Sequence, residues 1–458
     1  MKDIVASFDP TITIRGLKVP LDDAPDGQKN ERRSGSYYPM IDINGLQFAR
    51  QHIVSFNLFI GEDFLPTINC SLREVGQNFI NKFFPLDGEV ISVLIRSLNK
   101  DLKPIRQDYR ILSVEPSIGN DGQNTYSISA VLDVPQLFVD KIKDFPSMSS
   151  IDTLKAIAKE LGLGFATNVT SVDDIMTRIC PNTDYLDFIN NDVLSGAYAN
   201  DDSFFACYID QHYYLNFVEV NELIKTETDP ELTTITDVTV DHVGADQEKD
   251  PVVKRFLLTN NAQENFTANK IDGYSLKSIS GEVSLYIGYR AFLHYYDKKN
   301  ESSKDVFIET LTDPSATTDT VLLKGRDDED HTKQIRSIHF GNLHTDNVHK
   351  NYYVAKVQNI MNEMDLKKIN LTVRLPDFNP NLTMFKIVPV LIANYDRSYS
   401  DENSPPGKPS INFLASGTFI VTSLVYNYDP ALMTIHTTSV LAKREYIKAD
   451  RENKNINR

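Results

Sequence analysis

The sequence predicts a mainly β protein with α+β insertions, organised around two related β-domains. Two similar hairpins lie far apart in the chain, at residues 109–134 and 418–446, and each reads as strand, turn and strand. Phe and Tyr, which favour strands, number 24 and 21, and Trp is absent. The first hairpin alternates apolar and polar residues, and its apolar set is Tyr126, Ile128, Ala130, Leu132 and Val134. We therefore predict a duplicated β-domain with other material between the two copies.

The second hairpin carries apolar residues on both faces of its first strand. Strict alternation places Phe419, Val421 and Val425 on one face and Ile420, Leu424 and Tyr426 on the other. Such a pattern is typical of a strand that is covered on both sides.

The length, composition and net charge of the chain limit the classes of protein to which it can belong. A length of 458 residues allows two to four domains, and 41% hydrophobic with 24% charged residues is a globular composition. The net charge of −16 argues against a protein that holds nucleic acid by neutralising phosphates. Cys70, Cys180 and Cys207 form neither a disulfide framework nor a metal motif. No signal peptide and no run of ~20 apolar residues is visible, so we expect a cytosolic protein without a membrane span.

Changes of pattern along the chain predict six segments. They are an irregular N-terminal arm (1–39), a first β-domain (40–145), a small α+β domain (146–224), a β-rich peripheral domain with a linker (225–360), a second β-domain (361–447) and a polar tail (448–458). Both β-domains show the order strand, strand, hairpin. The first copy adds a short helix at 75–83 between its first two strands.

The two middle segments differ in how much secondary structure their sequences predict. In the α+β domain, a helix is predicted at 149–161, capped by Ser149 and ended by Gly162, and a second helix at 184–195 precedes a hairpin at 204–218. The peripheral segment predicts mostly strands through residue 359. Its candidate strands are 255–259, 281–287 and 291–296, and an acidic loop is expected at 327–330.

No motif marks a catalytic, cofactor-binding or metal site. His339, His344 and His349 recur every five residues. This spacing does not bring them onto one face of a helix or of a strand. The acidic run 327–330 lacks the alternation and the glycine of an EF-hand loop, and Gly162 with Gly164 reads as a helix stop. We therefore predict no enzyme activity, no cofactor and no metal, although the many carboxylates leave a glycosidase pair open.

Three stretches resemble the baseplate hub proteins of contractile-tailed bacteriophages. Residues 154–165 (LKAIAKELGLGF) resemble the helix that opens the hub's middle domain, residues 184–218 its helix and hairpin, and residues 417–446 its closing strands. The resemblance is to the T-even type hub and more distantly to the late-control and VgrG-type hubs, and it covers about residues 40–446. The chain lacks the long regular repeats of a fused β-helical needle, so the spike is expected to be a separate polypeptide.

The resemblance implies a structure and a set of partners. The two β-domains would be tail-tube-like β-barrels, and a homotrimer would place six of them in a ring, converting three-fold into pseudo-six-fold symmetry. A hexameric tail tube or a tube-initiator protein would stack on one side. A central spike, one that could bear a lysozyme domain, would dock on the other. Baseplate wedge proteins and the tape-measure protein are further implied partners, in a virion tail baseplate assembled in the host bacterial cytoplasm. DNA would pass through the ring, and the net charge suggests an acidic duct.

Two other classes remain open at this stage. A cell-wall hydrolase of the tail tip needs carboxylates positioned in a cleft, and zymography would detect its activity. A glycan-binding or receptor-binding tail protein could display the paired tyrosines at 213–214, 295–296 and 352–353. Such pairs more often lie in a strand core or an interface than in an exposed row.

Overall fold

The computed structural model covers both β-domains and the α+β domain almost completely. The residues it describes are 4–14, 36–61, 63–74, 79–86, 88–98, 103–118, 123–227, 258–260, 270–279, 290–297, 302–309, 320–321, 336–340, 348–394, 410–412, 414–443 and 446–447. The predicted strand at 281–287, the acidic loop, His344, the polar tail and most of the N-terminal arm lie outside these residues.

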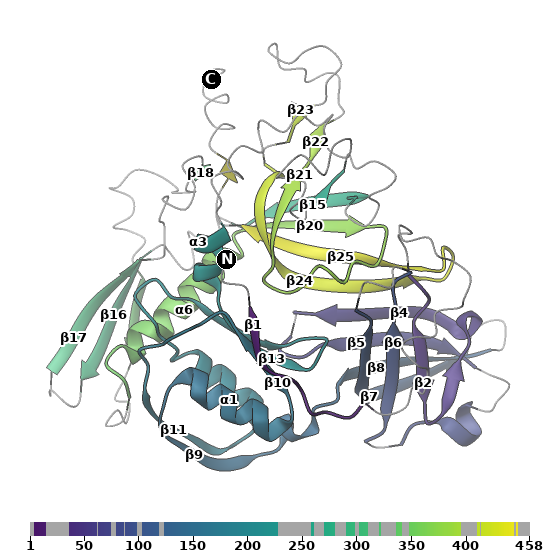
Figure 1. Ribbon diagram of the computed structural model, residues 1–458, viewed down its shortest axis with the longest axis horizontal. Coiled ribbons are helices and arrows are strands. Elements are labelled where there is room, and N and C mark those ends of the chain that lie inside the picture. Colours follow the sequence, from purple (N-terminus) through teal and green to yellow (C-terminus); the bar gives the residue numbers. More distant parts are fainter. Residues whose placement is uncertain are drawn as a thin grey trace.

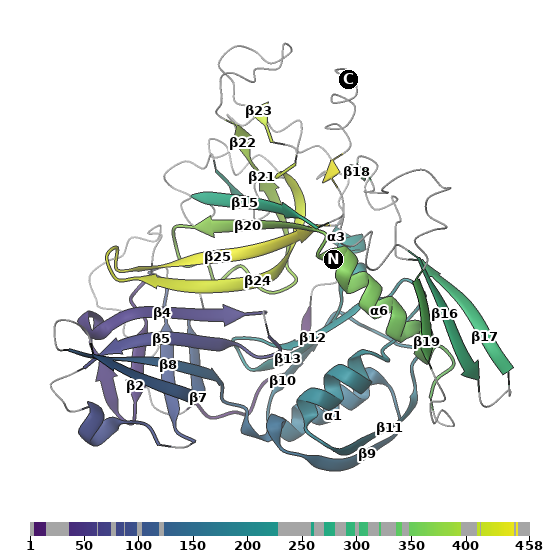
Figure 2. The same ribbon diagram turned by 180° about the vertical axis from the view of Figure 1, so that it is seen from behind.

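Most strands of the two β-domains belong to one 13-stranded sheet. Figures 1 and 2 show its two halves side by side from opposite sides. The first domain contributes β2 (Met40–Ile43), β3 (Leu46–Phe48), β4 (Ile53–Ile60), β5 (Thr67–Arg73), β6 (Val90–Ile95), β7 (Ile105–Ile118) and β8 (Asn124–Leu132). The later part of the chain contributes β14 (Leu258–Thr259), β15 (Gly273–Ser278), β20 (Ile369–Leu375), β21 (Ile387–Leu391), β24 (Gly417–Asp429) and β25 (Thr434–Lys443). Their order is β15-β20-β25-β24-β4-β5-β8-β7-β6-β2-β3, with β14 beside β21 and β21 beside β24. The predicted mainly β class is confirmed.

The sheet contains the same five-strand order twice. The order β4-β5-β8-β7-β6 in the first half corresponds to β15-β20-β25-β24-β21 in the second, and every neighbouring pair in both runs is antiparallel. Each long strand has a bulge at the same place, between Ile111 and Ser113 in β7 and between Val421 and Ser423 in β24. Just before each bulge, a backbone N–H donates to the carbonyl of the residue that precedes the neighbouring strand. Ile111 donates to Glu89 before β6, and Val421 donates to Lys386 before β21. The repeat therefore extends to register.

Strand β24 joins the two halves. Its first part pairs with β21, and beyond the bulge Leu424–Tyr428 pairs with β4 of the first half. Both views place the yellow β24–β25 hairpin directly against β4 and β5. The described strands thus form one continuous sheet across the two domains, and no pairing among them closes either half into a separate barrel.

The small α+β part lies beside this sheet and contains more strands than the sequence predicted. Its elements are β9 (Lys141–Met148), α1 (Ser150–Leu161), β10 (Gly164–Thr167), β11 (Met176–Thr183), α2 (Tyr185–Phe188) with a π-helical continuation (Ile189–Leu194), β12 (Phe205–Ile209), β13 (Tyr214–Glu219) and α3 (Val220–Glu227). The predicted helix caps are present: Ser149 accepts from the Asp152 N–H, and Gly162 is left-handed with φ +72°. The antiparallel pair β9–β11 and the parallel pair β10–β13 were not predicted.

The N-terminal arm is not wholly irregular, which corrects the expectation for residues 1–39. Strand β1 (Val5–Phe8) pairs antiparallel with β10 and forms the edge of the sheet β1-β10-β13-β12. The Thr11 N–H donates to the Gly162 carbonyl at 2.8 Å. A strand of four residues is too short to show a period, and it is stabilised by pairing with residues far away in the sequence.

The expectation of strands through residue 359 is also wrong in part, because α6 (Tyr352–Leu366) is a helix. Its buried side includes amides where a helix usually presents apolar residues. The Gln358 amide donates to the Ser203 carbonyl at 2.7 Å, and the Asn359 side chain accepts from the Phe205 N–H at 3.1 Å. Because the inward side is partly polar, the apolar stripe that predicts a helix is weak.

The remaining described elements are short and peripheral. They are the sheet of β16 (Arg290–Asp297), β17 (Ser302–Glu309) and β19 (Arg336–Phe340), the pairs β18 (Thr320–Val321) with β26 (Tyr446–Ile447) and β22 (Ala393–Asn394) with β23 (Ser410–Ile411), and helical turns at Arg50–His52, Phe79–Phe83 and Pro135–Phe138. The turn at Phe79–Phe83 lies within the helix predicted at 75–83.

Glu160 ties α1 to β9 and α2, and it makes a testable contribution to acid stability. Burial raises its pKa, but bonds from Lys141, Lys143 and Tyr185 outweigh burial and lower the pKa from 4.5 to about 2. The stabilisation that ionised Glu160 contributes is therefore complete above a pH of about 4.5 and is lost as the pH falls toward about 2. We expect Glu160→Gln to unfold at a lower temperature than wild type at neutral pH, and this difference to vanish by the lower pH. Thermal unfolding of both proteins across that range is the measurement, and a difference independent of pH would contradict this account.

Candidate functional site: the joint and the open face of the sheet

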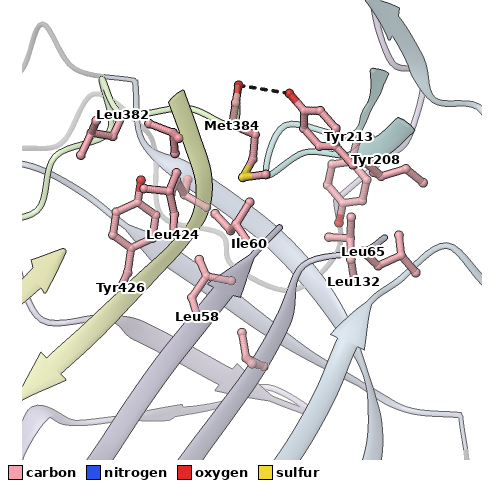
Figure 3. Close-up of a cluster of buried hydrophobic side chains, with 14 of the residues drawn as sticks. Leu58, Ile60, Leu65, Leu132, Tyr208, Tyr213, Leu382, Met384, Leu424 and Tyr426 are labelled. Atoms are coloured by element: carbon pink, nitrogen blue, oxygen red, sulfur yellow. Dashed lines mark hydrogen bonds between the residues drawn. The ribbon is translucent and has the colours of Figure 1, made fainter. Parts of the chain in front are cut away.

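The joint between the two halves is built by five residue pairs across β24 and β4. Leu424 lies opposite Ile60, Tyr426 opposite Leu58, and Tyr428 opposite Phe56. All six of these side chains are buried, and Figure 3 shows four of them, Leu58, Ile60, Leu424 and Tyr426, gathered in the core. The apolar positions of β4 were visible in the sequence, but their pairing with β24 was not. The two domains are therefore one hydrogen-bonded and apolar unit at this line.

The α+β part covers the inner side of the joint with tyrosines. The Tyr208 hydroxyl donates to the Met384 carbonyl at 3.5 Å (Figure 3), and the Asp108 N–H donates to the Tyr213 hydroxyl oxygen at 2.9 Å. The N–H of Ile209, at the end of β12, donates to the Phe64 carbonyl at 2.9 Å. Burial raises the pKa of both tyrosines, so each remains a neutral phenol. These bonds link the α+β part to both halves of the sheet.

Gly61 has a position that only glycine fits well. Its φ is +86°, and a Cβ there would lie 2.3 Å from the sulfur of Met384. Met384 fills the space between the end of β4 and the α+β part (Figure 3). The close approach of the two halves therefore depends on a residue without a side chain.

The opposite, open face of the sheet carries mainly neutral polar side chains. On the central strands, this face includes Ser55, Asn57, Thr67, Asn69, Ser71, Ser127, Ser129, Asn370, Thr372, Ser423, Asn427 and Thr438. Several of them bond across strands: Ser71 with Ser127 at 3.3 Å, and Asn427 with Thr438 at 3.2 Å. The net charge suggested an acidic face, but acidic side chains are rare there. Along the paired rows of β4, β5, β7, β8, β20 and β25, the exception is Glu115 of β7.

The two described histidines of the sequence pattern, His339 and His349, lie in separate parts of the fold. His349 is buried, its Nε2 lies 2.8 Å from the Gly196 carbonyl oxygen, and burial lowers its pKa. His339 lies in β19, in the three-stranded sheet β17-β16-β19. The described part of the chain contains no group of three side chains suited to holding a metal ion.

The paired tyrosines are largely structural. Tyr213, Tyr352 and Tyr353 are buried, and the Tyr214 hydroxyl donates to Asp9 near β1. These four side chains therefore do not form the exposed aromatic row that a glycan-binding surface would present, and the side chains of the pair at 295–296 lie outside the described ones. Cys70 is buried as well, and burial raises the pKa of its thiol to about 12. None of the described helices is long and apolar enough for a membrane crossing.

No protein-family model and no curated protein sequence matches the chain, but solved structures do. The 43 kDa tail protein of prophage MuSo2 from Shewanella oneidensis is similar with a TM-score of 0.52 at 10% identity, over 89% of this chain and 99% of that one. A tail protein from Neisseria meningitidis MC58 has a TM-score of 0.48 at 11% identity, over 89% and 96% of the two chains. An Escherichia coli component of the type VI secretion system has a TM-score of 0.40 at 9% identity, over 88% and 76%. The chain therefore has the fold of a phage tail protein, and the predicted resemblance is confirmed at the level of the fold.

Proposed function

We propose that the chain is a structural, non-enzymatic baseplate hub protein of a phage virion tail. Three copies form a ring in which each chain supplies two equivalent β-units, corresponding to the domains at 40–145 and 361–447. The α+β segment at 146–224 supports the joint between them, and the segment at 225–360 adds β14 and β15 to the second unit and is otherwise peripheral. The observation that carries the proposal is the repeated five-strand order joined edge to edge through β24 and β4.

The repeat gives a physical reason for the ring. Three chains with two equivalent units present six similar contact surfaces, which match a hexameric tail tube or tube initiator on one side. The three-fold symmetry of the chains themselves matches a central spike on the other side. Baseplate wedge proteins and the tape-measure protein are the further proposed partners, and assembly takes place in the host cytoplasm.

The open face of the sheet suits the wall of a duct for DNA. Its Ser, Thr and Asn side chains outnumber its basic ones, which include Arg73, Arg374 and Lys277, so the face gives limited phosphate neutralisation of the kind that holds DNA in place. The proposal therefore relies on a neutral polar lining rather than the acidic lining that the net charge suggested.

The native mass of the purified chain tests the ring. We expect light scattering behind size exclusion to give three times the 51.9 kDa of the monomer, either alone or after co-expression with the adjacent spike protein. Zymography on the same sample should show no cell-wall hydrolysis. A chain that remains monomeric with its spike would contradict the proposal, because the repeat would then have no ring to complete.

A further inference from the structure

Two strand edges at opposite ends of the repeated runs have no neighbour among the described strands. Beyond its bulge, β7 pairs with β8 along Val114–Ile118, and its other side meets no described strand. At the far end of the sheet, β15 pairs with β20 and has no further described neighbour. Apolar side chains on both edges are solvent-exposed, Ile118 by 77% and Tyr274 by 41%. Open edges with exposed apolar residues are sites where another strand can add.

The repeat identifies what these edges correspond to in the other half. The row Ile111, Ala130, Ile68, Leu58 crosses β7, β8, β5 and β4. The row Val421, Leu441, Leu371, Leu276 crosses β24, β25, β20 and β15 in the same way. Thus β7 occupies the place of β24, and β15 occupies the place of β4. In the chain itself, the equivalents of the two open edges are paired with each other.

The difference in burial follows this difference in pairing. On β24, Tyr426 and Tyr428 are buried against β4, whereas Pro116 and Ile118 at the same positions of β7 are exposed. On β4, Phe56 is buried against β24, whereas its equivalent Tyr274 is exposed. Ile118 and Tyr274 are strand-forming residues, although both are exposed in the single chain.

We propose that the outer half of β7 pairs antiparallel with β15 of a second copy of this chain, in the register that β24 and β4 use. The register places Glu115 opposite Lys277 of the second copy, Ser117 opposite Ser275, and Ile118 opposite Tyr274. This inference rests on the proposed ring and specifies its interface between chains.

The side chains brought together are complementary. Glu115 and Lys277 have opposite charges and would both lie on the open face, as their equivalents Val425 and Phe59 do. Ile118 and Tyr274 would cover each other on the inner face. Pro116 has no N–H to donate, so the pairing has one donor fewer than its equivalent in the chain, and the proline discourages pairing with unrelated strands.

The positions of the two edges also allow a ring to close. They lie at opposite ends of the strand run from β15 to β7, so the contact between copies is head to tail. A head-to-tail contact forms a closed ring when its rotation divides a full turn. Because the contact would copy the β24–β4 joint, the rotation between neighbouring halves of two chains would resemble that between the two halves of one chain, and the rotation between whole chains would be twice as large.

Paired cysteines in a two-by-two design test the register. The cognate variants are Glu115→Cys with Lys277→Cys and Ser117→Cys with Ser275→Cys. The mismatched variants exchange partners: Glu115→Cys with Ser275→Cys and Ser117→Cys with Lys277→Cys. Residues directly opposite in an antiparallel pair fall within disulfide range, whereas positions two residues out of register do not. Wild type, whose cysteines are buried or half-buried, is the oxidation control.

The native mass of each variant is measured first under reducing conditions, followed by mild oxidation and a non-reducing gel. We expect both cognate variants to give a covalent trimer at least tenfold faster than the mismatched ones. A trimer that cross-links in neither cognate variant, or equally in all four, would overturn the strand pairing while leaving the hub function standing. A protein that is monomeric before oxidation, with or without its spike, would overturn the proposed ring itself.

Discussion

Leu58→Asp is expected to cause one of the two largest losses of stability in the chain. Leu58 is buried in the joint, between Tyr426 of β24 and Ile68 of β5. None of these apolar neighbours can compensate for a buried carboxylate, which must either ionise without a partner or become protonated. We expect a cost of ~4 kcal/mol or more, which places the change among the most severe point substitutions. Thermal unfolding should show it as a lower midpoint or as separate transitions for the two halves.

Asn57→Asp is the matched control, because it adds the same charge one residue away. Asn57 lies on the open face, opposite Asn427 and Asn69, and is partly exposed. Its carboxylate would remain hydrated, so the expected change is within about 1 kcal/mol. Equal losses in the two variants would show that the joint is not the apolar boundary described here.

Local patterns in the sequence predicted much of this fold. Strand β8 alternates along its length, and α1 has a serine at its start and a glycine at its end, so each is encoded by neighbouring residues. The repeat was also visible in the sequence, because strand, strand and hairpin follow in the same order twice. These features depend on residues close together in the chain.

The joint itself could not be predicted in that way. Strands β4 and β24 are far apart in the sequence, and no local pattern identifies which open edges will pair. The bulge near Thr422 also shifts the alternation of β24, so Val421 and Leu424 share the inner face. The expectation that Val425 lies on the face of Phe419 and Val421 was therefore wrong beyond the bulge.

The open face had a signal in the sequence that was not used. Segments such as TINCSLR in β5 and INLTVRL in β20 alternate apolar residues with Ser, Thr and Asn, and charges are few at the alternate positions. An ordinary solvent-exposed sheet face carries more Lys and Glu. Such alternation on neighbouring strands indicates one buried and one exposed face of the sheet.

The second large effect is expected for Asp174→Ala, in the α+β part. The side chains of Asp174 and Arg178 are fully buried, and a guanidinium nitrogen of Arg178 lies 3.8 Å from a carboxylate oxygen of Asp174. The Asp174 carboxylate also accepts the N–H of Ser150 at 3.0 Å and that of Tyr198 at 3.2 Å. It therefore joins the start of α1 to the loop that follows α2. Removing it leaves a buried guanidinium and two backbone donors without this partner, at an expected cost of ~3–5 kcal/mol.

Two other variants separate the possible causes of that loss. Asp173→Ala removes a neighbouring carboxylate whose ion pair with Lys350 is exposed, so its expected cost is below ~1 kcal/mol. Arg178→Met removes the cation but leaves Asp174 bonded to both N–H groups, so an intermediate loss is expected. Thermal unfolding orders the three variants, and hydrogen exchange at the first turn of α1 should increase most in Asp174→Ala. If Asp173→Ala were as damaging, the loss would reflect the net charge of this region rather than the buried contacts of Asp174.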